Sequence, residues 1–393
     1  MIEWILWAIM LMLAGSLVVL STVARRMPTA TAGSESGAPA RRVVVIVPVA
    51  GEEPAMEATV RSLLGLTYPS FEVVFVFADA GEPAAKAVQA LAQAQPAVRC
   101  VVAGRATDCG QKNHNLLAGI AAVEGRSDVL VFADAGHVFP DAWLERLVGP
   151  IAKGEAEVTS GYYAVTPVSR GWAEWGFAFS VEFLSWLHRF PGIRQPWGGA
   201  TAISRDAFDR LHVADAWRGA MVDDVMLARV LKRAGVQVRS VPGIRLDTPV
   251  GAMTFAEWFE WLVRQFQYIR FILPGTWLAA GVWGSLLLAG AVAAVVLVVA
   301  GLAGVTSALP GAVSALYLTV MAVVMLQIRL QHPAPCSSGR WLVVGFLTLA
   351  VACLAHVAAG VRREICWRGI GYRVGAGGRV LAVHRASPPV SAR

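Results

Sequence analysis

Acidic residues follow three apolar, β-branched runs of the sequence. Glu52 comes soon after residues 43–49 (VVVIVPV), Asp79 follows residues 73–77 (VVFVF), and Asp134 follows residues 129–132. Carboxylates just past the ends of buried strands can hydrogen-bond a nucleoside or hold a metal ion against a diphosphate. A local role is the alternative for each of them, because Asp in such positions also caps the following helix or forms an Asx turn.

Two further groups of polar residues lie downstream. Asp223 and Asp224 open a helical pattern, where one of them could act as a general base and where both could instead be caps. Gln267 and Arg270 are three residues apart, on one face of a predicted helix, and Phe271 follows them. This set could grip a diphosphate beside an aromatic ring. It could also belong to an interfacial belt of aromatic side chains.

The apolar runs between these residues predict the elements that position them. Residues 43–49, 73–77 and 129–132 predict buried parallel strands. Helical patterns alternate with them near residues 54–65, 82–94, 112–124 and 140–152. This alternation predicts an α/β fold with a doubly wound sheet, in which ligands bind at the carboxyl ends of the strands. The sequence contains no GxGxxG motif and no P-loop, which argues against a Rossmann dehydrogenase or an NTPase.

Long apolar stretches flank this α/β region. Hydrophobic residues make up 56% of the 393 residues and charged residues 16%, which excludes a disordered chain and argues against an ordinary soluble enzyme. Residues 4–24, 271–328 and 341–361 contain no charged side chain, and the second stretch, of 58 residues, is long enough for two helices. We therefore predict one N-terminal and about three C-terminal transmembrane helices.

The distribution of charge predicts the orientation in the membrane. Arg25 and Arg26 follow the first apolar stretch, so the positive-inside rule places the N-terminus outside and the α/β region in the cytoplasm, at the inner (plasma) membrane. Three further crossings would leave the C-terminal tail outside. The tail is rich in arginine from Arg362 onward, which favours the inside. Either one apolar segment is re-entrant or the rule is overridden here.

The basic character of the chain belongs to its flanking segments. Residues 41–270 hold 23 basic and 24 acidic residues, whereas the whole chain has a net charge of +7. This distribution suits anionic lipid headgroups and argues against nucleic-acid binding. Five cysteines form no CxxC pair, so neither a zinc site nor a disulfide scaffold is indicated.

These patterns divide the chain into an anchor (1–27), a linker (28–40), a cytoplasmic α/β domain (41–270), transmembrane segments (271–361) and a basic tail (362–393). Within the α/β domain, residues 172–190 combine many aromatic side chains with Glu174 and Glu182. We expect an amphipathic helix at the lipid surface there, where it would form the entrance for a membrane-bound substrate. An ordinary core helix is the alternative.

The order of the polar motifs carries the most specific signal. It resembles that of the membrane glycosyltransferases with a GT-A fold in five places: Asp79, Lys112-Asn-His-Asn115, Asp134-Ala-Gly136, Asp223-Asp224 and Gln267-x-x-Arg270-Phe271. Asp-Ala-Gly in place of a full Asp-x-Asp, the single N-terminal anchor and the tail motif at 366–373 (CWRGIGYR) resemble the ceramide glucosyltransferase family. Phe271 replaces the usual Trp of that family, and Asp223 stands where Glu is usual.

The resemblance implies a role for each motif. Asp79 would contact the uridine of a UDP-sugar, Asp134 would face the diphosphate and its Mg²⁺ or Mn²⁺, and Asp224 would remove the proton of the acceptor hydroxyl. Gln267 and Arg270 would hold the leaving diphosphate, and Lys112 would neutralise phosphate unless it is an exposed helical lysine. The remaining implied substrate contacts are Glu52, Asn115, Asp223 and Phe271. Gly136 replaces a second acid, so a two-carboxylate clamp is absent.

Together these observations predict an inverting transferase that moves a sugar from a UDP-sugar to the hydroxyl of a membrane lipid, such as ceramide, a hopanoid or a diacylglycerol. A processive polysaccharide synthase is the second hypothesis, although about three C-terminal helices are few for a polymer channel. A third hypothesis, of another class, is a membrane scaffold or transport protein with a degenerate transferase domain. The retained acids and Arg270 argue against it.

Overall fold

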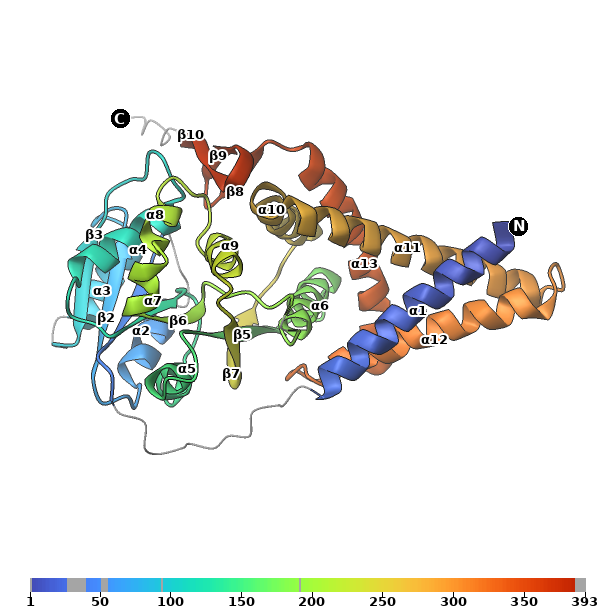
Figure 1. Cartoon of the computed structure of the whole chain (residues 1–393), viewed down its shortest axis with the longest axis horizontal. Coiled ribbons are helices and arrows are strands. Elements are labelled where there is room, and N and C mark those ends of the chain that lie inside the picture. The colour runs from blue at the N-terminus through green and yellow to red at the C-terminus, as the bar shows by residue number, and fades with distance from the viewer. Residues whose placement is uncertain (1, 27–39, 51–55, 93–94, 191, 386–393) are drawn as a thin grey trace.

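The protein consists of an α/β domain and a group of long apolar helices that projects from it (Figure 1). The structure is a computed structural model and describes residues 2–26, 40–50, 56–92, 95–190 and 192–385. Helix α1 (Ile2–Arg26) belongs to the projecting group, and the α/β domain begins with β1. Glu52 lies outside the described residues, so its predicted contact stays a prediction.

A mixed sheet of seven strands forms the centre of the α/β domain, in the order β3-β2-β1-β4-β6-β5-β7. Strands β1 to β4 pair in parallel, β6 is antiparallel to both β4 and β5, and β7 is parallel to β5. The three predicted strands are present and four more join them. Their bounds are β1 (Val43–Pro48), β2 (Phe71–Phe77), β3 (Val98–Val102), β4 (Val129–Ala133), β5 (Val158–Pro167), β6 (Ala200–Ser204) and β7 (Val238–Val250).

Helices cover both faces of this sheet, as expected of a doubly wound fold. Side chains of β1 alternate between two cores: Val43 and Val45 face one, and Val44 and Ile46 face the other. The first core is completed by α2 (Met56–Leu64), α3 (Pro83–Ala92) and α5 (Trp143–Ala152). The second is completed by α4 (Gln111–Ala122), α7 (Arg205–Arg210), α8 (Val213–Trp217) and α9 (Asp224–Ala234). The predicted fold class is confirmed.

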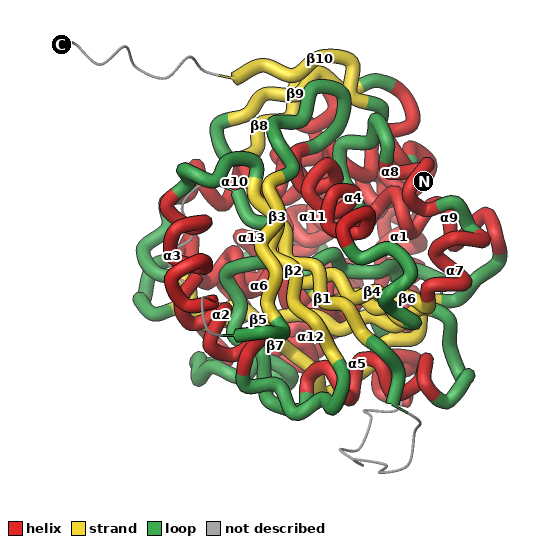
Figure 2. Tube along the Cα trace, turned by 90° about the vertical axis from the view of Figure 1, so that its left-hand side faces the viewer, coloured by secondary structure: helices red, strands yellow, loops and turns green. Residues whose placement is uncertain are grey.

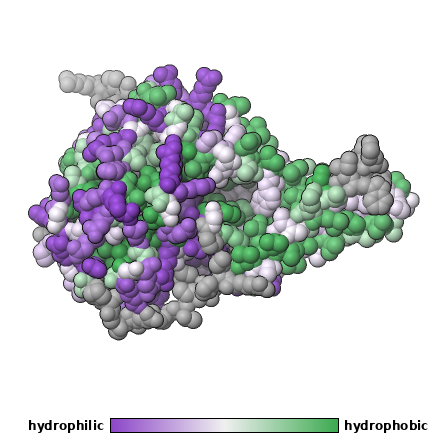
Figure 3. All heavy atoms as spheres, in the orientation of Figure 1, coloured by the Kyte–Doolittle hydropathy of each residue, from purple (hydrophilic) through white to green (hydrophobic). Residues whose placement is uncertain are grey.

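Four described helices are long and apolar enough to cross a membrane: α1, α11 (Pro274–Leu302), α12 (Ala308–Arg329) and α13 (Ser338–Val361). Helices α11 and α12 form a hairpin against which α1 packs, and the face of this group seen in Figure 3 is mostly hydrophobic. Helix α13 runs across the base of the group, next to the α/β domain (Figure 1). Helix α10 (Phe255–Ile272) begins with a capping box between Thr254 and Glu257 and leads into α11.

Most of helix α6 (Trp172–Leu187) is buried, packed against β5, α10 and α13. Ser180 accepts a hydrogen bond from Trp258 Nε1 of α10 (3.1 Å), and Glu182 forms an ion pair with Arg245 of β7. Such burial agrees with the alternative that residues 172–190 form an ordinary core helix. It does not agree with an amphipathic helix that has one face at the lipid surface.

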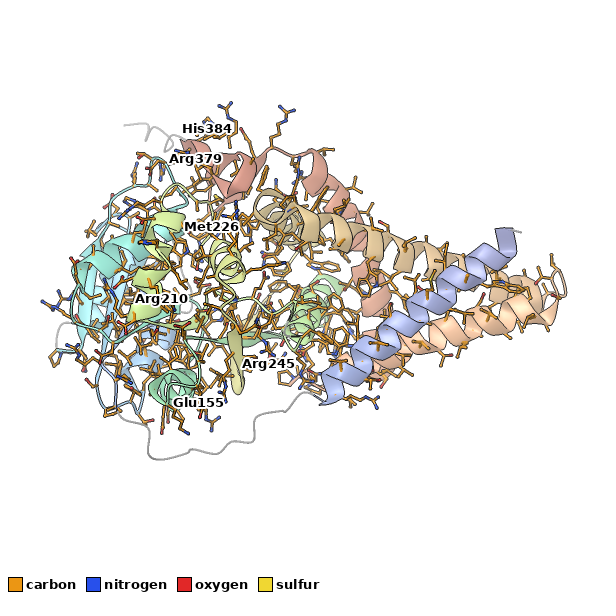
Figure 4. The ribbon with its side chains drawn as sticks, in the orientation of Figure 1. Glu155, Arg210, Met226, Arg245, Arg379 and His384 are labelled. Carbon is orange, nitrogen blue, oxygen red and sulfur yellow. The ribbon has the colours of Figure 1, made fainter. Side chains whose placement is uncertain are left out.

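The described part of the segment predicted as a basic tail forms a three-stranded antiparallel sheet of β8 (Glu364–Trp367), β9 (Ile370–Val374) and β10 (Val380–Arg385) (Figure 2). It is attached to the α/β domain by backbone hydrogen bonds from Val380 N to Gly219 O (2.8 Å) and from Met221 N to Gly378 O (3.0 Å). Figure 4 shows Arg379 and His384 of this sheet above Met226 of α9. The chain therefore returns to the α/β domain after its last apolar helix.

Candidate active site

A cavity of about 1740 Å³ lies between the α/β domain and the apolar helices. Its polar end contains Lys112 and the acids Asp134, Asp223 and Asp224. Apolar side chains from α1, α6, α11, α12 and α13 form other parts of the wall, among them Leu17, Phe183, Leu287, Met325 and Leu349. The cavity thus connects the carboxyl edge of the sheet with helices that can enter a membrane.

Lys112, in the first turn of α4, links two acids from different elements. Its Nζ lies 2.7 Å from Oδ1 of Asp134, just after β4, and 3.2 Å from Oδ1 of Asp223, just before α9. Gly198 allows this approach, because a Cβ at that position would lie 2.4 Å from Asp223 Oδ2 and 2.5 Å from Lys112 Nζ. The alternative of an exposed helical lysine is therefore wrong for Lys112.

The electrostatics of this acid cluster favour a charged lysine and a carboxylate that titrates near neutrality. Burial lowers the pKa of Lys112, but the charges of Asp134, Asp223 and Asp224 outweigh burial and raise it. Burial and then the charge of Asp223 raise the pKa of Asp224 to about 7, against the opposing effect of Lys112. Burial likewise raises the pKa of Asp223. A carboxylate with a pKa near 7 suits proton transfer in neutral solution.

The two adjacent acids occupy different environments. Asp223 is only 2% exposed, and its side chain pairs with Lys112. It stands at the N-cap position of α9 but makes no capping hydrogen bond, so the predicted cap is wrong for this residue. Asp224 is more exposed and lines the cavity, and its Oδ1 accepts a hydrogen bond from Val225 N (2.7 Å).

Asp79 and Asn115 lie outside the acid cluster. Asp79 is exposed after β2, and its Oδ1 accepts a hydrogen bond from Gly81 N (2.9 Å), which is the Asx-turn alternative. Asn115 is fully buried, and its Nδ2 donates to Val49 O (3.0 Å) and Val76 O (3.1 Å). Its amide therefore ties the ends of β1 and β2 together. This makes Asn115 a positioning residue in place of the direct substrate contact expected from the sequence.

Gln267 and Arg270 both lie against the C-terminal segment rather than in the acid cluster. Gln267 Nε2 donates to Glu364 O (2.8 Å). Arg270 Nη1 donates to Ala359 O (2.7 Å) and Arg362 O (2.9 Å).

Phe271, next in sequence, packs against the hydrophobic cluster formed by the C-terminal sheet. Other residues of α10, including Arg264 and Tyr268, line the cavity instead. The predicted contacts of Gln267, Arg270 and Phe271 with a diphosphate stay predictions.

Several residues of the cavity wall were missed at the sequence level. Trp197 stacks on Tyr163, with ring centroids 4.6 Å apart and an interplanar angle of 19°. Trp367 and Arg368 reach the cavity from the turn between β8 and β9. Arg368 Nη1 donates to Ala50 O (2.9 Å), next to the carboxyl end of β1. Trp367 and Arg368 belong to the motif at 366–373. That motif indicated the family, but it did not indicate that these two residues reach the cavity.

Comparison with known families decides which class of protein carries this site. Residues 5–380 match the profile of Glycosyl transferase family 21. The chain belongs to this family. Its predicted identity as a glycosyltransferase with a GT-A fold is thereby confirmed.

Solved structures similar to this family 21 glycosyltransferase include the mannosyltransferase PcManGT from Pyrobaculum calidifontis, in complex with GDP-Man and Mn²⁺. It is 18% identical, the match covers 90% of this chain and 99% of that one, and the TM-score is 0.49. Glucosyl-3-phosphoglycerate synthase from Mycobacterium tuberculosis, in complex with Mn²⁺ and UDP-glucose, is 17% identical over 64% of this chain and 82% of its own, with a TM-score of 0.39. No curated protein matches the chain significantly.

The side chains that could bind a metal ion in this family 21 glycosyltransferase fit a cation for which the protein supplies only some of the ligands. Among the described residues, no group of three or more His, Cys, Asp and Glu side chains is placed to hold a metal ion. Asp134 has a side chain that is 31% exposed and that faces the cavity. His137 Nδ1 lies 2.7 Å from Thr248 Oγ1, and the His137 ring packs edge-on against Trp197. One carboxylate beside an open cavity suits Mg²⁺ or Mn²⁺ that takes its other ligands from a diphosphate and water.

Proposed function

We propose that this family 21 glycosyltransferase moves a sugar from a UDP-sugar to the hydroxyl of a membrane lipid, with a ceramide-like, hopanoid or glycerolipid acceptor. The observation that carries the proposal is the cavity that joins the acid cluster to the apolar helices. A lipid could keep its chains between these helices while its hydroxyl reaches Asp224, whereas a soluble acceptor needs no such apolar walls. The proposed place is the inner (plasma) membrane, with the α/β domain facing the cytoplasm.

The donor end of the proposed site lies at the carboxyl ends of β1, β2 and β4, where doubly wound sheets bind nucleotides. Asp134 would hold Mg²⁺ or Mn²⁺, which neutralises charge on the diphosphate when bound. Asp79 and Glu52 are the proposed contacts of the nucleoside. Arg368 is a proposed contact of the diphosphate, because it lines the cavity and its Nη1 donates to Ala50 O at the end of β1. Arg270 donates instead to carbonyl groups of the C-terminal segment.

Asp224 is the proposed general base. As the lipid oxygen attacks the anomeric carbon, its proton passes to the carboxylate of Asp224, and the bond from the sugar to the UDP oxygen breaks on the opposite face. This single displacement inverts the configuration and releases UDP. Lys112 would position Asp223 and Asp134, while burial of Asp224 and the charge of Asp223 raise the pKa of Asp224.

The test supplies the purified protein with a panel of radiolabelled UDP-sugars and a total lipid extract. Label that moves to the organic phase supports the proposal and identifies the sugar and the acceptor class together. Label retained as a polymer in the aqueous phase would support the polysaccharide synthase, and no transfer from any donor would support the scaffold or transport protein.

The proposed orientation has a separate test. A reporter fused after residue 40 should behave as a cytoplasmic protein, and periplasmic alkaline phosphatase activity at that point would contradict the orientation.

A further inference from the structure

The sequence leaves a conflict about the C-terminal part of the chain. Three apolar helices follow the α/β domain, and an odd number of crossings would separate the C-terminal sheet from that domain. Yet the sheet is hydrogen-bonded to the domain through Val380 and Met221. No membrane can lie between two segments in direct contact, so the number of crossings after the domain must be even.

Helices α11 and α12 account for two crossings. Helix α11 begins directly after α10, which packs on the α/β domain, and the α11–α12 turn lies at the far end of the projecting group (Figure 1). The chain that follows α12 is back at the α/β domain. There His332 Nε2 lies 2.9 Å from Val165 O of β5, and Arg245 Nη1 of β7 donates to Gln331 O (2.8 Å).

Helix α13 is bound to the α/β domain at both of its ends. Near its start, the guanidinium of Arg340 donates to Gly171 O (3.4 Å) and lies over the ring of Trp172, 4.8 Å from its centroid. At its end, Arg362 Nη1 lies 2.6 Å from Glu260 Oε2 of α10. A helix that crossed the bilayer could keep only one end at a domain on one side of it.

The middle of α13 also lies along the domain. Gly345 lets it approach α6 closely, since a Cβ there would lie 2.9 Å from the ring of Phe179. The face turned away from α6 and α10 is apolar and exposed, with exposed fractions of 55% at Val343, 65% at Leu354, 66% at Val357 and 74% at Val361. These residues recur at intervals of 11, three and four positions, so they form one stripe along the helix.

We propose that α13 lies in the plane of the membrane surface, with this stripe in contact with lipid, and that the C-terminal sheet is on the same side as the α/β domain. We take the bilayer to cover this stripe, because α13 packs against α11 and α12, whose exposed side chains are also apolar. The arrangement leaves three crossings in total, by α1, α11 and α12. It also places the arginines between Arg362 and Arg385 on the side of the domain, which removes the conflict with the positive-inside rule.

Labelling of single cysteines tests the sidedness. In the full chain with the native cysteines replaced by serine, Val305→Cys reports the α11–α12 turn, Leu381→Cys the C-terminal sheet, and Glu124→Cys the α/β domain. All three sites are exposed. A membrane-impermeant maleimide added to intact cells should label Cys at 305 but reach the other two positions only after permeabilisation. Labelling at 381 together with 305, and not with 124, would overturn the proposal.

Depth measurements test the orientation of α13 itself. Nitroxide labels at Val343, Leu354 and Val361 of the full chain, reconstituted in phospholipid vesicles, should show similar depths and high accessibility to oxygen dissolved in lipid. A crossing helix would instead put 354 deepest, with 343 and 361 near opposite surfaces. Low oxygen accessibility at all three sites would show that protein covers the stripe, such as a second copy of the chain. Either of these results would refute the in-plane helix.

Discussion

Substitution of Gly198 by alanine should disrupt the acid cluster without disturbing the fold. A Cβ at position 198 would lie 2.4 Å from Asp223 Oδ2 and 2.5 Å from Lys112 Nζ, about 1 Å short of the 3.4 Å at which ordinary contact begins. The side-chain ends of Lys112 and Asp223 must therefore move by an amount of that size. A displacement of about 1 Å in a catalytic site can cost on the order of 10²-fold in rate. This corresponds to about 2.7 kcal/mol in activation free energy.

The assay measures kcat for transfer of labelled sugar to lipid, together with UDP-sugar binding and the Tm in detergent. Gly251→Ala is the matched control, because nothing lies within 4 Å of a Cβ there. We expect Gly198→Ala to lose about 10² in kcat while it keeps nucleotide binding and a Tm close to that of Gly251→Ala. A kcat within a factor of about two of the control would refute the reasoning that the Lys112–Asp223 pair positions the site.

Three further predictions concern the cation, the pH dependence and the diphosphate. EDTA should lower transfer activity and Mg²⁺ or Mn²⁺ should restore it, whereas full activity in EDTA would contradict the proposal that Asp134 holds a cation. Because the pKa of Asp224 is raised to about 7, the base is protonated below that pH, so kcat/KM should fall as the pH drops through 7; a flat profile would contradict this assignment. Arg368→Ala should raise the KM for the UDP-sugar roughly tenfold with a smaller change in kcat, and an unchanged KM would place the diphosphate elsewhere.

Three strands of the sheet could be predicted from the sequence because they are buried on both faces. Continuous valine-rich runs mark β1, β2 and β4, and helical patterns between them gave boundaries within a few residues of α2, α3, α4 and α5. Strands β3, β5, β6 and β7 were missed. Strand β3 is a partly exposed edge strand that contains Arg99, and β5 contains Gly161 and several polar residues and gains its place from pairing with β7. Such long-range pairing is not expressed in a local pattern.

The members of the acid cluster could be predicted, but their contacts could not. Lys112 and Asp223 are more than a hundred positions apart in the sequence, and no local pattern indicates their ion pair. The spacing of Gln267 and Arg270 correctly put them on one helix, whereas their partners are supplied by the end of α13 and the segment that follows it. The two apolar ends of the chain could be recognised from composition alone. Which helix lies across the others follows from the packing of α13 on α6 and α10, and no local pattern expresses such long-range contacts.

The most direct test of the central claim is transfer of labelled sugar into organic-extractable lipid by the wild type, Asp224→Asn and Asp223→Asn, with UDP-sugar binding measured in parallel. Asn at 224 is nearly isosteric with Asp, so binding should survive, and loss of the base should lower kcat by on the order of 10²–10⁴. Asp223→Asn should lose less, because it alters the environment of the base and leaves the base itself in place. Near-normal turnover by Asp224→Asn would contradict the assignment of Asp224 as the base. If Asp223→Asn were inactive in the same experiment, the base would be Asp223, and if both variants turned over normally, base-catalysed transfer at this site would be refuted.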